Sequence, residues 1–340
     1  MRIGVVGATG LVGGQLLRTR EDRGFPTGEL RAFASARSAG RAVPYRGVEV
    51  LVEEAASASY EGLDVVLMSA GATLSRQLAP RIAAQGPLVI DNSSAWRTDP
   101  AVPLVVAEVT PAALADAPRG IIANPNCTTM VCMPVVAPLH AEAGLLRIVA
   151  STYQAVSGAG VEAVAELATQ VATAGEKARE LAWAGDSVDL GRPRVFPQPI
   201  AFNVVPQAGT FVDDETDEEK KFRNESRRIL SLPSLDVTST CVRVPVFTGH
   251  SVSLVLETAR DLAPERAVEL LSSAPGVELA DVPTPLLAAG RDPSYVGRIR
   301  RAGDRPRCLA AFVSGDNLRK GAALNAVQIA ETLVAQGRLG

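Results

Sequence analysis

The sequence predicts an α/β protein of two domains: an N-terminal domain built on a parallel sheet, followed by an α+β domain. Residues 2–22 form an apolar run, a glycine-rich turn and a helical pattern, which is typical of a strand, a loop and a helix. Apolar runs then recur about every 20–30 residues with helical patterns between them, which indicates βαβ units. Beyond about residue 125, alternating and β-branched segments indicate antiparallel strands instead.

Five segments are expected to supply the further strands of the first domain. Their nearly continuous apolar character fits a parallel sheet that helices cover on both faces. They are residues 30–35 (LRAFAS), 63–71 (LDVVLMSAG), 87–94 (PLVIDNSS), 104–109 (LVVAEV) and 120–124 (GIIAN).

In the second domain, residues 146–160 and 235–260 carry the pattern of antiparallel strands. A stretch that contains many prolines and glycines, about residues 185–209, lies between them. An acidic run then opens a helical pattern at residues 220–230, where carboxylates near a helix N-terminus are favourable. The last residues, 321–339, are strongly helical.

Composition limits the classes of partner and the location. The net charge of −3 and the aromatic content of 4% provide neither a basic field nor stacking platforms for nucleic acid. Glycines stand where a signal peptide is apolar, and no window approaches about 18 apolar residues, so we expect a soluble, cytoplasmic protein without a membrane span. The four cysteines form no CxxC pair and no zinc-like spacing with the two histidines, which indicates a reducing compartment and no metal site.

Gly7, Gly10 and Gly13 lie between the first predicted strand and the first predicted helix. Glycines are needed where a pyrophosphate approaches bare backbone, and a helix N-terminus supplies free N–H groups and a positive dipole. The spacing is GxxGxxG rather than GxGxxG, so the position directly after an apolar strand carries most of the prediction. We therefore expect a Rossmann-like nucleotide-binding domain; the alternative is a tight strand–helix turn without a ligand.

The end of the second predicted strand distinguishes NADP from NAD. NAD sites usually place an Asp or Glu there to bind the ribose 2′-hydroxyl. Here the segment contains Ser35, Arg37 and Ser38 and no carboxylate. An arginine flanked by hydroxyls suits a 2′-phosphate, so NADP is the expected cofactor; the alternative is a solvated Arg37 in a loop.

Cys127 is the candidate nucleophile, because it lies in the polar segment NPNCTT just before an apolar helical run. A helix N-terminus stabilises a thiolate, so we expect a lowered pKa for Cys127 and attack on a carbonyl carbon. Most single cysteines are buried small hydrophobes, which is our interpretation of Cys132, Cys241 and Cys308. The polar neighbours of Cys127 argue against that interpretation for this residue.

A cysteine nucleophile needs an acid or base nearby, and the chain has only two histidines, His140 and His250. His140 lies near the end of the helix that Cys127 begins, about 20 Å away at the helical rise. His250 lies beside Gly249, which interrupts a strand, and its unperturbed pKa is close to neutral pH. His250 is therefore the expected acid/base; the alternative is a structural histidine at a strand end.

Eight motifs together resemble the aspartate-semialdehyde dehydrogenase family, in family order and over essentially the whole chain. They are GATGLVG, DNSSAWR, NPNCTT, YQAVSGAG, RVFPQPIAFNVVPQ, EEKKFRNES, RVPVFTGHS and SGDNLRKGAALNAVQIAE. The resemblance implies NADPH-dependent reductive dephosphorylation of L-aspartyl-4-phosphate to L-aspartate 4-semialdehyde through an acyl-thioester on Cys127. This reaction lies on the route to lysine, methionine and threonine.

The same resemblance implies roles for individual residues. Cys127 corresponds to the nucleophile, Gln154 to the residue that positions thioester and substrate, and His250 to the general acid/base. Arg243 corresponds to the clamp on the substrate α-carboxylate, which its planar fork suits. The remaining substrate residues implied are Glu218 for the ammonium group, and Arg97 and Lys221 for the phosphate.

For the cofactor, the resemblance implies contacts from Thr9, Gly10, Leu11, Val12, Gly13, Ser35, Arg37, Ser38, Ser157, Gly158 and Asn317. Because Asn317 must reach the nicotinamide, we expect residues 315–340 to complete the N-terminal domain, which spans residues 1–125. Residues 126–311 are expected to form the catalytic and dimerisation domain. Its mixed sheet is expected to form a homodimer interface, with a homotetramer as the alternative.

The chain departs from the family pattern at residues 218–221, where EEKK replaces the common EEWK. The choice of Lys221 then rests on alignment through Glu225, and a solvated charged helix face is the alternative for this segment. Two other functions stay open at this point. One is another acyl-phosphate reductase, of the N-acetyl-glutamyl-phosphate or glyceraldehyde-phosphate type; the other is a non-catalytic NADP-binding paralogue.

Overall fold

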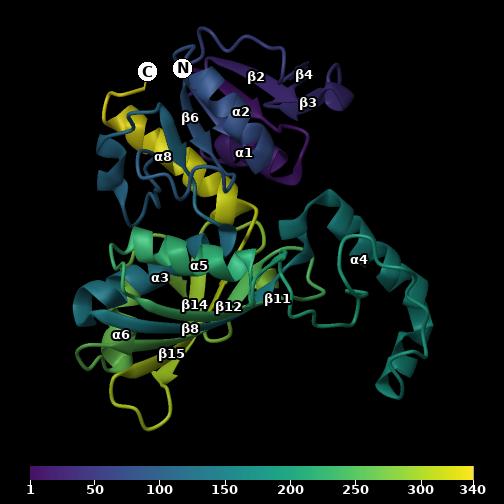
Figure 1. Ribbon diagram of the computed structural model, residues 1–340, viewed down its shortest axis with the longest axis vertical. Coiled ribbons are helices and arrows are strands. Elements are labelled where there is room, and N and C mark those ends of the chain that lie inside the picture. The colour runs from purple at the N-terminus through teal and green to yellow at the C-terminus, as the bar shows by residue number, and fades with distance from the viewer. Residues whose placement is uncertain (340) are drawn as a thin grey trace.

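Two β-sheets organise the protein in the computed structural model, which describes residues 1–339 (Figure 1). The first sheet has the strand order β3-β4-β2-β1-β5-β6-β7 and is parallel except for the antiparallel β3–β4 pair. Its strands are β1 (Arg2–Val6), β2 (Glu29–Ala34), β3 (Ala42–Tyr45), β4 (Val48–Glu54), β5 (Val65–Met68), β6 (Leu88–Asp91) and β7 (Ile121–Ala123).

Helices cover both faces of this sheet. Alternate residues of β1 point to opposite sides, so Ile3 and Val5 share one core with α1 (Leu11–Asp22) and α8 (Leu324–Ala335). Val6 shares the other core with α2 (Ala72–Ala83). The C-terminal helix therefore packs on the sheet that the N-terminus begins, as Figure 1 shows.

The second sheet is mixed, with the order β11-β8-β12-β15-β14-β13. The β11–β8 and β13–β14 pairs are parallel and the others antiparallel. Its strands are β8 (Leu145–Gln154), β11 (Asp236–Arg243), β12 (His250–Thr258), β13 (Val277–Leu279), β14 (Ser294–Arg301) and β15 (Cys308–Gly315). Three helices pack on the face that carries Ile148 and Leu254: α3 (Cys127–Ala143), α5 (Asp217–Ile229) and α6 (Pro264–Ser272).

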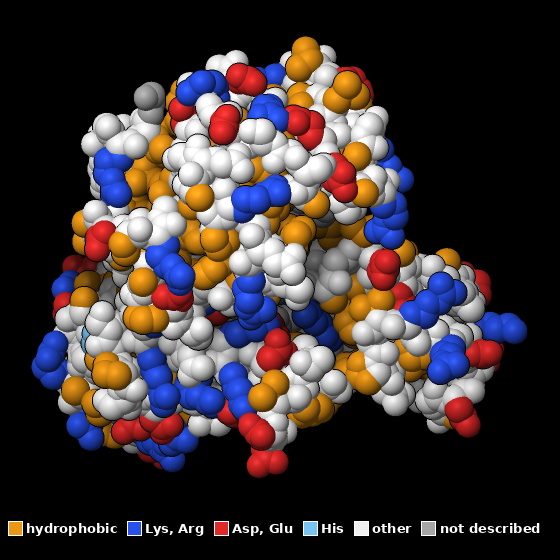
Figure 2. Space-filling view, turned by 45° about the horizontal axis from the view of Figure 1, so that its top comes forward, with side chains coloured by type: hydrophobic (Ala, Val, Ile, Leu, Met, Phe, Trp, Pro, Cys, Tyr) orange, Lys and Arg blue, Asp and Glu red, His pale blue; other side chains and the backbone are white. Residues whose placement is uncertain are grey.

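An extension leaves this sheet after β8 and projects to one side (Figure 1). It contains the short helices η3 (Val156–Ala159) and η4 (Gly175–Ala182), the helix α4 (Val161–Ala174), and the hairpin β9 (Phe211–Val212) and β10 (Glu215–Thr216). Figure 2 shows a hollow between this extension and the rest of the protein, and charged side chains of both signs interspersed over the visible face. Among residues 1–339, no helix combines the length and hydropathy needed to cross a membrane.

The predicted fold class is confirmed, but two expected details are wrong. Residues 104–109 are not a strand; only Leu104 forms a single bridge, to Ala123. The side chain of Asn325 bonds the carbonyl of Val105 and the N–H of Ala107, both at 2.8 Å, and thereby satisfies backbone groups that a ladder would otherwise pair.

The second wrong detail is the direction of β11, which runs parallel to β8 rather than antiparallel. Parallel neighbours need a long crossover connection. The extension and α5 together provide one between these two strands.

Helix α5 begins and ends as its sequence dictates. Thr216 caps it, and Glu219 completes a capping box through the Thr216 backbone N–H at 2.7 Å. Acidic residues occupy its first turn and arginines its last, which suits the helix dipole. The cap matters because the first turn carries Glu218 into the site described below.

Replacing Thr216 with Ala should lower the free energy of unfolding by about 1 kcal/mol, because the N–H of Glu219 loses its acceptor. Thr216→Ser keeps the hydroxyl and should retain most of the stability. Urea denaturation of the three proteins measures the difference. Equal stability of Thr216→Ala and the parent would show that the cap does not stabilise α5.

Candidate active site

Three neighbouring strands of the second sheet meet at the candidate site. Gln154 ends β8 and pairs in register with Arg243, which ends β11. His250 begins β12, next to this pair. Since alternate residues of a strand share a face, these side chains lie on the face covered by α3, whose first residue is Cys127.

Helix α3 begins at Cys127, as predicted, and Asn126 caps it. Oδ1 of Asn126 accepts a hydrogen bond from the backbone N–H of Thr128 at 2.9 Å. Its backbone N–H donates to Glu225 at 2.6 Å, and its Nδ2 donates to the two oxygens of Glu218 at 3.2 and 3.0 Å. Two carboxylates of α5 therefore hold the residue that precedes the nucleophile.

The Sγ of Cys127 lies 3.3 Å from Nε2 of His250. The backbone N–H of Ala155 donates to Nδ1 of the same ring at 3.0 Å. Because Nδ1 accepts that hydrogen bond, the proton of the neutral imidazole resides on Nε2 and faces the sulfur. His250 is therefore arranged as a proton donor toward Cys127 or toward a group bound to it.

Burial dominates the ionisation of this pair. Burial, reinforced by the charge of Glu218, raises the pKa of Cys127 to about 11, against opposing effects of Arg243 and Arg97. Burial, followed by the charge of Arg243, lowers the pKa of His250 to about 3. The expectation of a lowered thiol pKa is therefore wrong, because desolvation outweighs the two arginines and the Thr128 N–H, and His250 does not keep its unperturbed pKa.

The other histidine and the other cysteines have structural surroundings. Nδ1 of His140, near the end of α3, accepts a hydrogen bond from the backbone N–H of Leu145 at 3.0 Å and so holds the connection to β8. Cys132, Cys241 and Cys308 are buried. Burial raises the pKa of the Cys132 and Cys241 thiols, which agrees with their interpretation as apolar core residues.

Glu218 forms the acidic side of the site. Besides Asn126, its carboxylate accepts from Nε2 of Gln154 at 3.2 Å and from Nζ of Lys221 at 2.9 Å. Burial alone would raise the pKa of this carboxyl, but the Lys221 ammonium, the charge of Arg243 and the Gln154 hydrogen bond bring it down to about 2. Glu218 therefore stays ionised and suits a cationic ligand group.

Arg243 has an unsatisfied donor in the same space. Its Nη1 donates to the carbonyl of Ala155 at 2.9 Å, whereas its buried Nε has no hydrogen-bond partner within residues 1–339. A buried unpaired donor is costly, and an anionic oxygen would satisfy it. A Cβ on Gly158 would lie 2.8 Å from this Nη1 and 3.2 Å from Nε2 of His250, so glycine keeps the space open.

Arg97 and Lys221, the two predicted phosphate residues, line one small cavity of about 150 Å³. Arg97 is fixed by an ion pair with Glu225 at 3.1 Å and by hydrogen bonds to two backbone carbonyls. Lys221 pairs with Asp217 at 2.6 Å and with Glu218 at 2.9 Å. The structure brings the two cations together, and carboxylates already neutralise part of their charge.

The glycine turn after β1 is built for close backbone approach. Gly7 has φ +83°, and a Cβ on it would lie 2.0 Å from the carbonyl oxygen of Ser69. A Cβ on Gly13 would lie 2.0 Å from the carbonyl oxygen of Gly7. Gly10 is the N-cap of α1, so the free N–H groups of that helix begin at this turn.

The loop after β2 lies against this turn. Oγ1 of Thr9 donates to Oγ of Ser38 at 3.4 Å. Ser38 is buried, whereas Ser35 and Arg37 are exposed. An exposed arginine in a loop that contacts the glycine turn fits the phosphates of a dinucleotide such as NADP.

Asn317 links the C-terminal segment to the surroundings of His250. Its Oδ1 accepts from the backbone N–H of Gly249 at 2.8 Å, and its Nδ2 donates to Oγ of Ser157 at 2.9 Å. Asn317 and Ser157 are both buried. The structure therefore places these two predicted cofactor residues together, next to the strand that His250 begins.

Two residues of the site, Asn126 and Glu225, are absent from the sequence-based predictions. A signal for Asn126 is present, since Asn is a favoured N-cap and directly precedes Cys127. Glu225 lies two helical turns after Glu218 and shares its face. Nothing in the sequence indicates its partner Arg97, because that contact arises only from tertiary packing.

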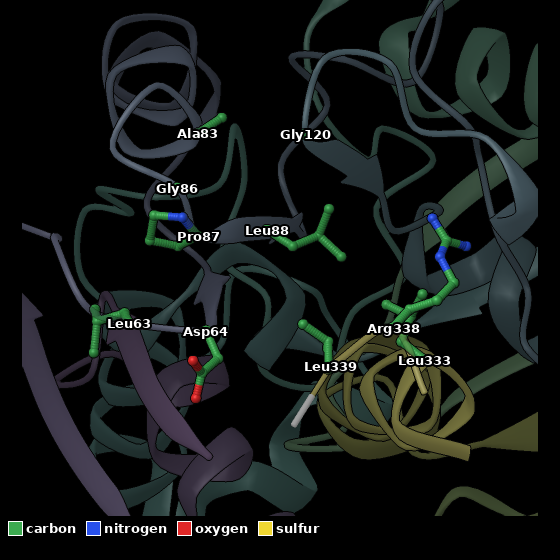
Figure 3. Close-up of a pocket in the computed structure, with 10 residues that line it drawn as sticks. All are labelled: Leu63, Asp64, Ala83, Gly86, Pro87, Leu88, Gly120, Leu333, Arg338 and Leu339. Atoms are coloured by element: carbon green, nitrogen blue, oxygen red, sulfur yellow. The ribbon is translucent and has the colours of Figure 1, made fainter. Parts of the chain in front are cut away.

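A separate cavity of about 400 Å³ lies at the opposite end of the first sheet (Figure 3). Asp64, Leu88 and Gly120 line it, at the amino ends of β5, β6 and β7. Ligands of open parallel sheets bind at the carboxyl ends of the strands. The glycine turn after β1 satisfies that rule, and this cavity does not.

The chain is similar to known proteins over nearly its whole length. Residues 2–117 match the family described as "Semialdehyde dehydrogenase, NAD binding domain", and residues 136–320 match "Semialdehyde dehydrogenase, dimerisation domain". The aspartate-semialdehyde dehydrogenase of Streptomyces akiyoshiensis is 59% identical over 339 residues, 99% of each chain, and that of Aquifex aeolicus is 45% identical over 99% of this chain and 98% of its own. The crystal structure of aspartate semialdehyde dehydrogenase II from Vibrio cholerae, complexed with ASA, superimposes with a TM-score of 0.91 at 40% identity over 98% of each chain.

Replacing Glu218 with Gln should lower the pKa of Cys127, because the charge of Glu218 raises it and Lys221 then keeps only its ion pair with Asp217. Each unit of lowering increases the thiolate fraction below the pKa about tenfold. Iodoacetamide should therefore alkylate Cys127 faster at about pH 8. Mass spectrometry of the Cys127 peptide across pH measures this.

The exposed Glu176 provides the matched control for this measurement. Glu176→Gln should leave the pH profile of alkylation unchanged. A profile that stays in place or moves to higher pH in Glu218→Gln would contradict the assignment of Glu218 as the carboxylate that opposes the thiolate.

Proposed function

The chain belongs to the aspartate-semialdehyde dehydrogenase family, and from this premise we propose that it converts L-aspartyl-4-phosphate to L-aspartate 4-semialdehyde by NADPH-dependent reductive dephosphorylation. The reaction passes through an acyl-thioester on Cys127 and serves the biosynthesis of lysine, methionine and threonine. The observation that carries the proposal is the 3.3 Å separation between Sγ of Cys127 and Nε2 of His250, beside Glu218 and the unpaired Nε of Arg243.

In the first step the sulfur of Cys127 bonds to the acyl carbon, and the bond from that carbon to the phosphate oxygen breaks. The attacking species is the thiolate, so charge on sulfur must be stabilised. The charges of Arg243 and Arg97 favour it, and the Nε2 proton of His250 faces it. Arg97 and Lys221 hold the departing phosphate, a role that their shared cavity supports.

When bound, NADPH supplies the hydride that reduces the thioester carbon. The tetrahedral intermediate then expels the sulfur of Cys127 and leaves the aldehyde. His250, the proposed acid/base, donates a hydrogen bond to this departing thiolate, since its protonated Nε2 faces the sulfur. Gln154 positions the thioester from the end of β8.

The aspartyl group is held at both of its charged ends. Arg243 binds the α-carboxylate through its unpaired Nε edge, and Glu218 receives the ammonium group. The low pKa of Glu218 supports this role, since the carboxyl stays charged across the physiological range. The two groups lie on adjoining elements, β11 and the start of α5.

The cofactor assigned is NADP, supported by the tight glycine turn and the exposed Arg37. The residues assigned to it are Gly7, Thr9, Gly10, Leu11, Val12, Gly13, Ser35, Arg37, Ser38, Ser157, Gly158 and Asn317. The N-terminal domain is assigned to residues 1–125 with 315–340, which the packing of α8 on β1 supports. Residues 126–311 are assigned to catalysis and dimerisation.

A homodimer through the second sheet is the assembly we propose, in the cytoplasm. One face of that sheet carries Tyr153 and Phe312, whose rings lie 5.9 Å apart, and Tyr153 is 38% exposed. The match of residues 136–320 to a dimerisation domain supports this face as the interface. Light scattering separates a dimer from a homotetramer.

Cys127→Ser and His250→Ala should each lower kcat by at least about 100-fold, because one removes the thiolate nucleophile and the other its proton donor. The assay is phosphate-dependent reduction of NADP by aspartate semialdehyde. Cys308→Ala, at the opposite end of β15 from Gly315, is the cysteine control and should retain turnover.

Near-normal turnover in Cys127→Ala would show that the covalent scheme is wrong. Turnover of N-acetyl-glutamyl phosphate or 1,3-bisphosphoglycerate in preference to aspartyl phosphate would favour another acyl-phosphate reductase. Failure of the purified wild-type protein with all three would favour the non-catalytic paralogue.

Arg37→Gln should lower kcat/KM for NADP about tenfold or more and leave kcat/KM for NAD nearly unchanged, because only NADP carries the 2′-phosphate. Arg41→Gln, on an exposed arginine of the same loop, is the matched control. Initial rates with both cofactors measure the ratio. An equal loss with NADP and NAD would show that Arg37 does not bind the 2′-phosphate.

A further inference from the structure

A single π-helical turn, η5 (Arg319–Ala323), joins β15 to α8 and passes directly behind the nucleophile. A Cβ on Gly321 would lie 2.7 Å from Cβ of Cys127, 3.1 Å from its Cα and 3.3 Å from its carbonyl oxygen. The backbone of Gly321 lies outside the left-handed region, so space alone requires glycine here. Any side chain at this position must displace Cys127 or the turn.

A buried ion pair holds η5 in place. Nζ of Lys320, which is fully buried, pairs with Glu108, and Glu108 also accepts from Nε2 of Gln328 at 3.0 Å. A Cβ on Gly276 would lie 2.1 Å from Oε1 of Glu108, so the carboxylate has little room to move. Breaking a buried pair by removing one partner is strongly unfavourable, and the pair therefore holds Lys320 in place.

The loop that precedes Cys127 is bonded to the same segment. Nδ2 of Asn124 donates to the carbonyl of Ala322 at 3.3 Å, and Asn325 donates to Oδ1 of Asn124. Asn124 and Asn325 are completely buried. The approach to the nucleophile is therefore tied to η5 by side chains as well as by the contact at Gly321.

The other end of the segment reaches the surroundings of His250. Asp316 accepts from the backbone N–H groups of Leu318 and Arg319 at 2.8 and 2.9 Å, which shapes the entry into η5. The adjacent Asn317 bonds the N–H of Gly249, directly before His250. One short segment thus contacts Cys127 at one point and the backbone before His250 at another.

We propose that Gly321, held by the Lys320–Glu108 ion pair, is a positioning residue that sets the separation between Cys127 and His250. The wider π turn brings its backbone against Cys127, and π turns often occur at functional sites. The inference rests on the proposed role of Cys127 as nucleophile. Misplacement of a reacting group by about 1 Å lowers rates by about 100-fold, so the geometry at Gly321 bears directly on turnover.

Gly321→Ala tests the proposal in the full-length protein. We expect kcat to fall about 100-fold with little change in KM, because the thiol moves while the substrate clamps stay. The pH profile of Cys127 alkylation by iodoacetamide should shift, since the thiol loses its contact with His250. The matched control is Gly185→Ala, an exposed position where an added Cβ meets no atom within 4 Å.

A merely structural role for Gly321 predicts a different result: a lower melting temperature with an unchanged kcat and alkylation profile, and that outcome overturns the proposal. A shifted alkylation profile with unchanged kcat would instead count against Cys127 as the nucleophile, which separates the two hypotheses.

If Gly321→Ala does not fold, Lys320→Met combined with Glu108→Gln tests the proposal by removing the ion pair that holds η5. This double variant removes both charges, and so leaves no uncompensated buried ion. The expected result is a fall in kcat and a shifted alkylation profile, as for Gly321→Ala. Retention of both at the wild-type values would refute the positioning role.

Discussion

The rest of the site depends on the contacts that the buried carboxylate of Glu218 makes. It accepts hydrogen bonds from Asn126 before the nucleophile, from Gln154 at the end of β8 and from Lys221 one turn further along its own helix. Three elements that are distant in the sequence therefore meet at one charge. Because little water competes for that charge, each contact is strengthened, and the loss of any one leaves the ion less compensated. The cap at Thr216 makes this possible, since it sets where α5 begins.

Burial, together with the charge of Glu218, keeps Cys127 protonated. Burial and Glu218 raise the pKa of Cys127, while Arg243 and Arg97 lower it by smaller amounts. A cation bound to Glu218 would offset this unfavourable charge, and an anion bound to Arg243 would offset part of the favourable one. A protonated thiol reacts slowly with oxidants and alkylating agents. The arrangement therefore keeps Cys127 in its less reactive form.

Local signals in the sequence predict the position of this site better than its chemistry. The start of α3 at Cys127 and the start of α5 follow from capping residues and helical periodicity, which act over a few residues. The signs of the pKa shifts of Cys127 and His250 do not follow, because they depend on burial by elements far away in the sequence. Residues 104–109 do not form a strand for a related reason. The side chain of Asn325, from α8, bonds the backbone groups of Val105 and Ala107 instead. The partners of Asn126 and the contact at Gly321 likewise exist only once both sheets have assembled.

The path of the chain explains why so much of the site lies between the sheets. The chain leaves the first sheet between β7 and α3 and returns to it between β15 and α8, and the nucleophile and Gly321 lie on these two crossings. An ion-pair cluster of Arg23, Arg319, Asp22, Asp292 and Glu331 links the end of α1 to η5, α8 and the loop before β14. Because Arg319 belongs to η5, the cluster ties the crossing that carries Gly321 to the second sheet as well as to the first.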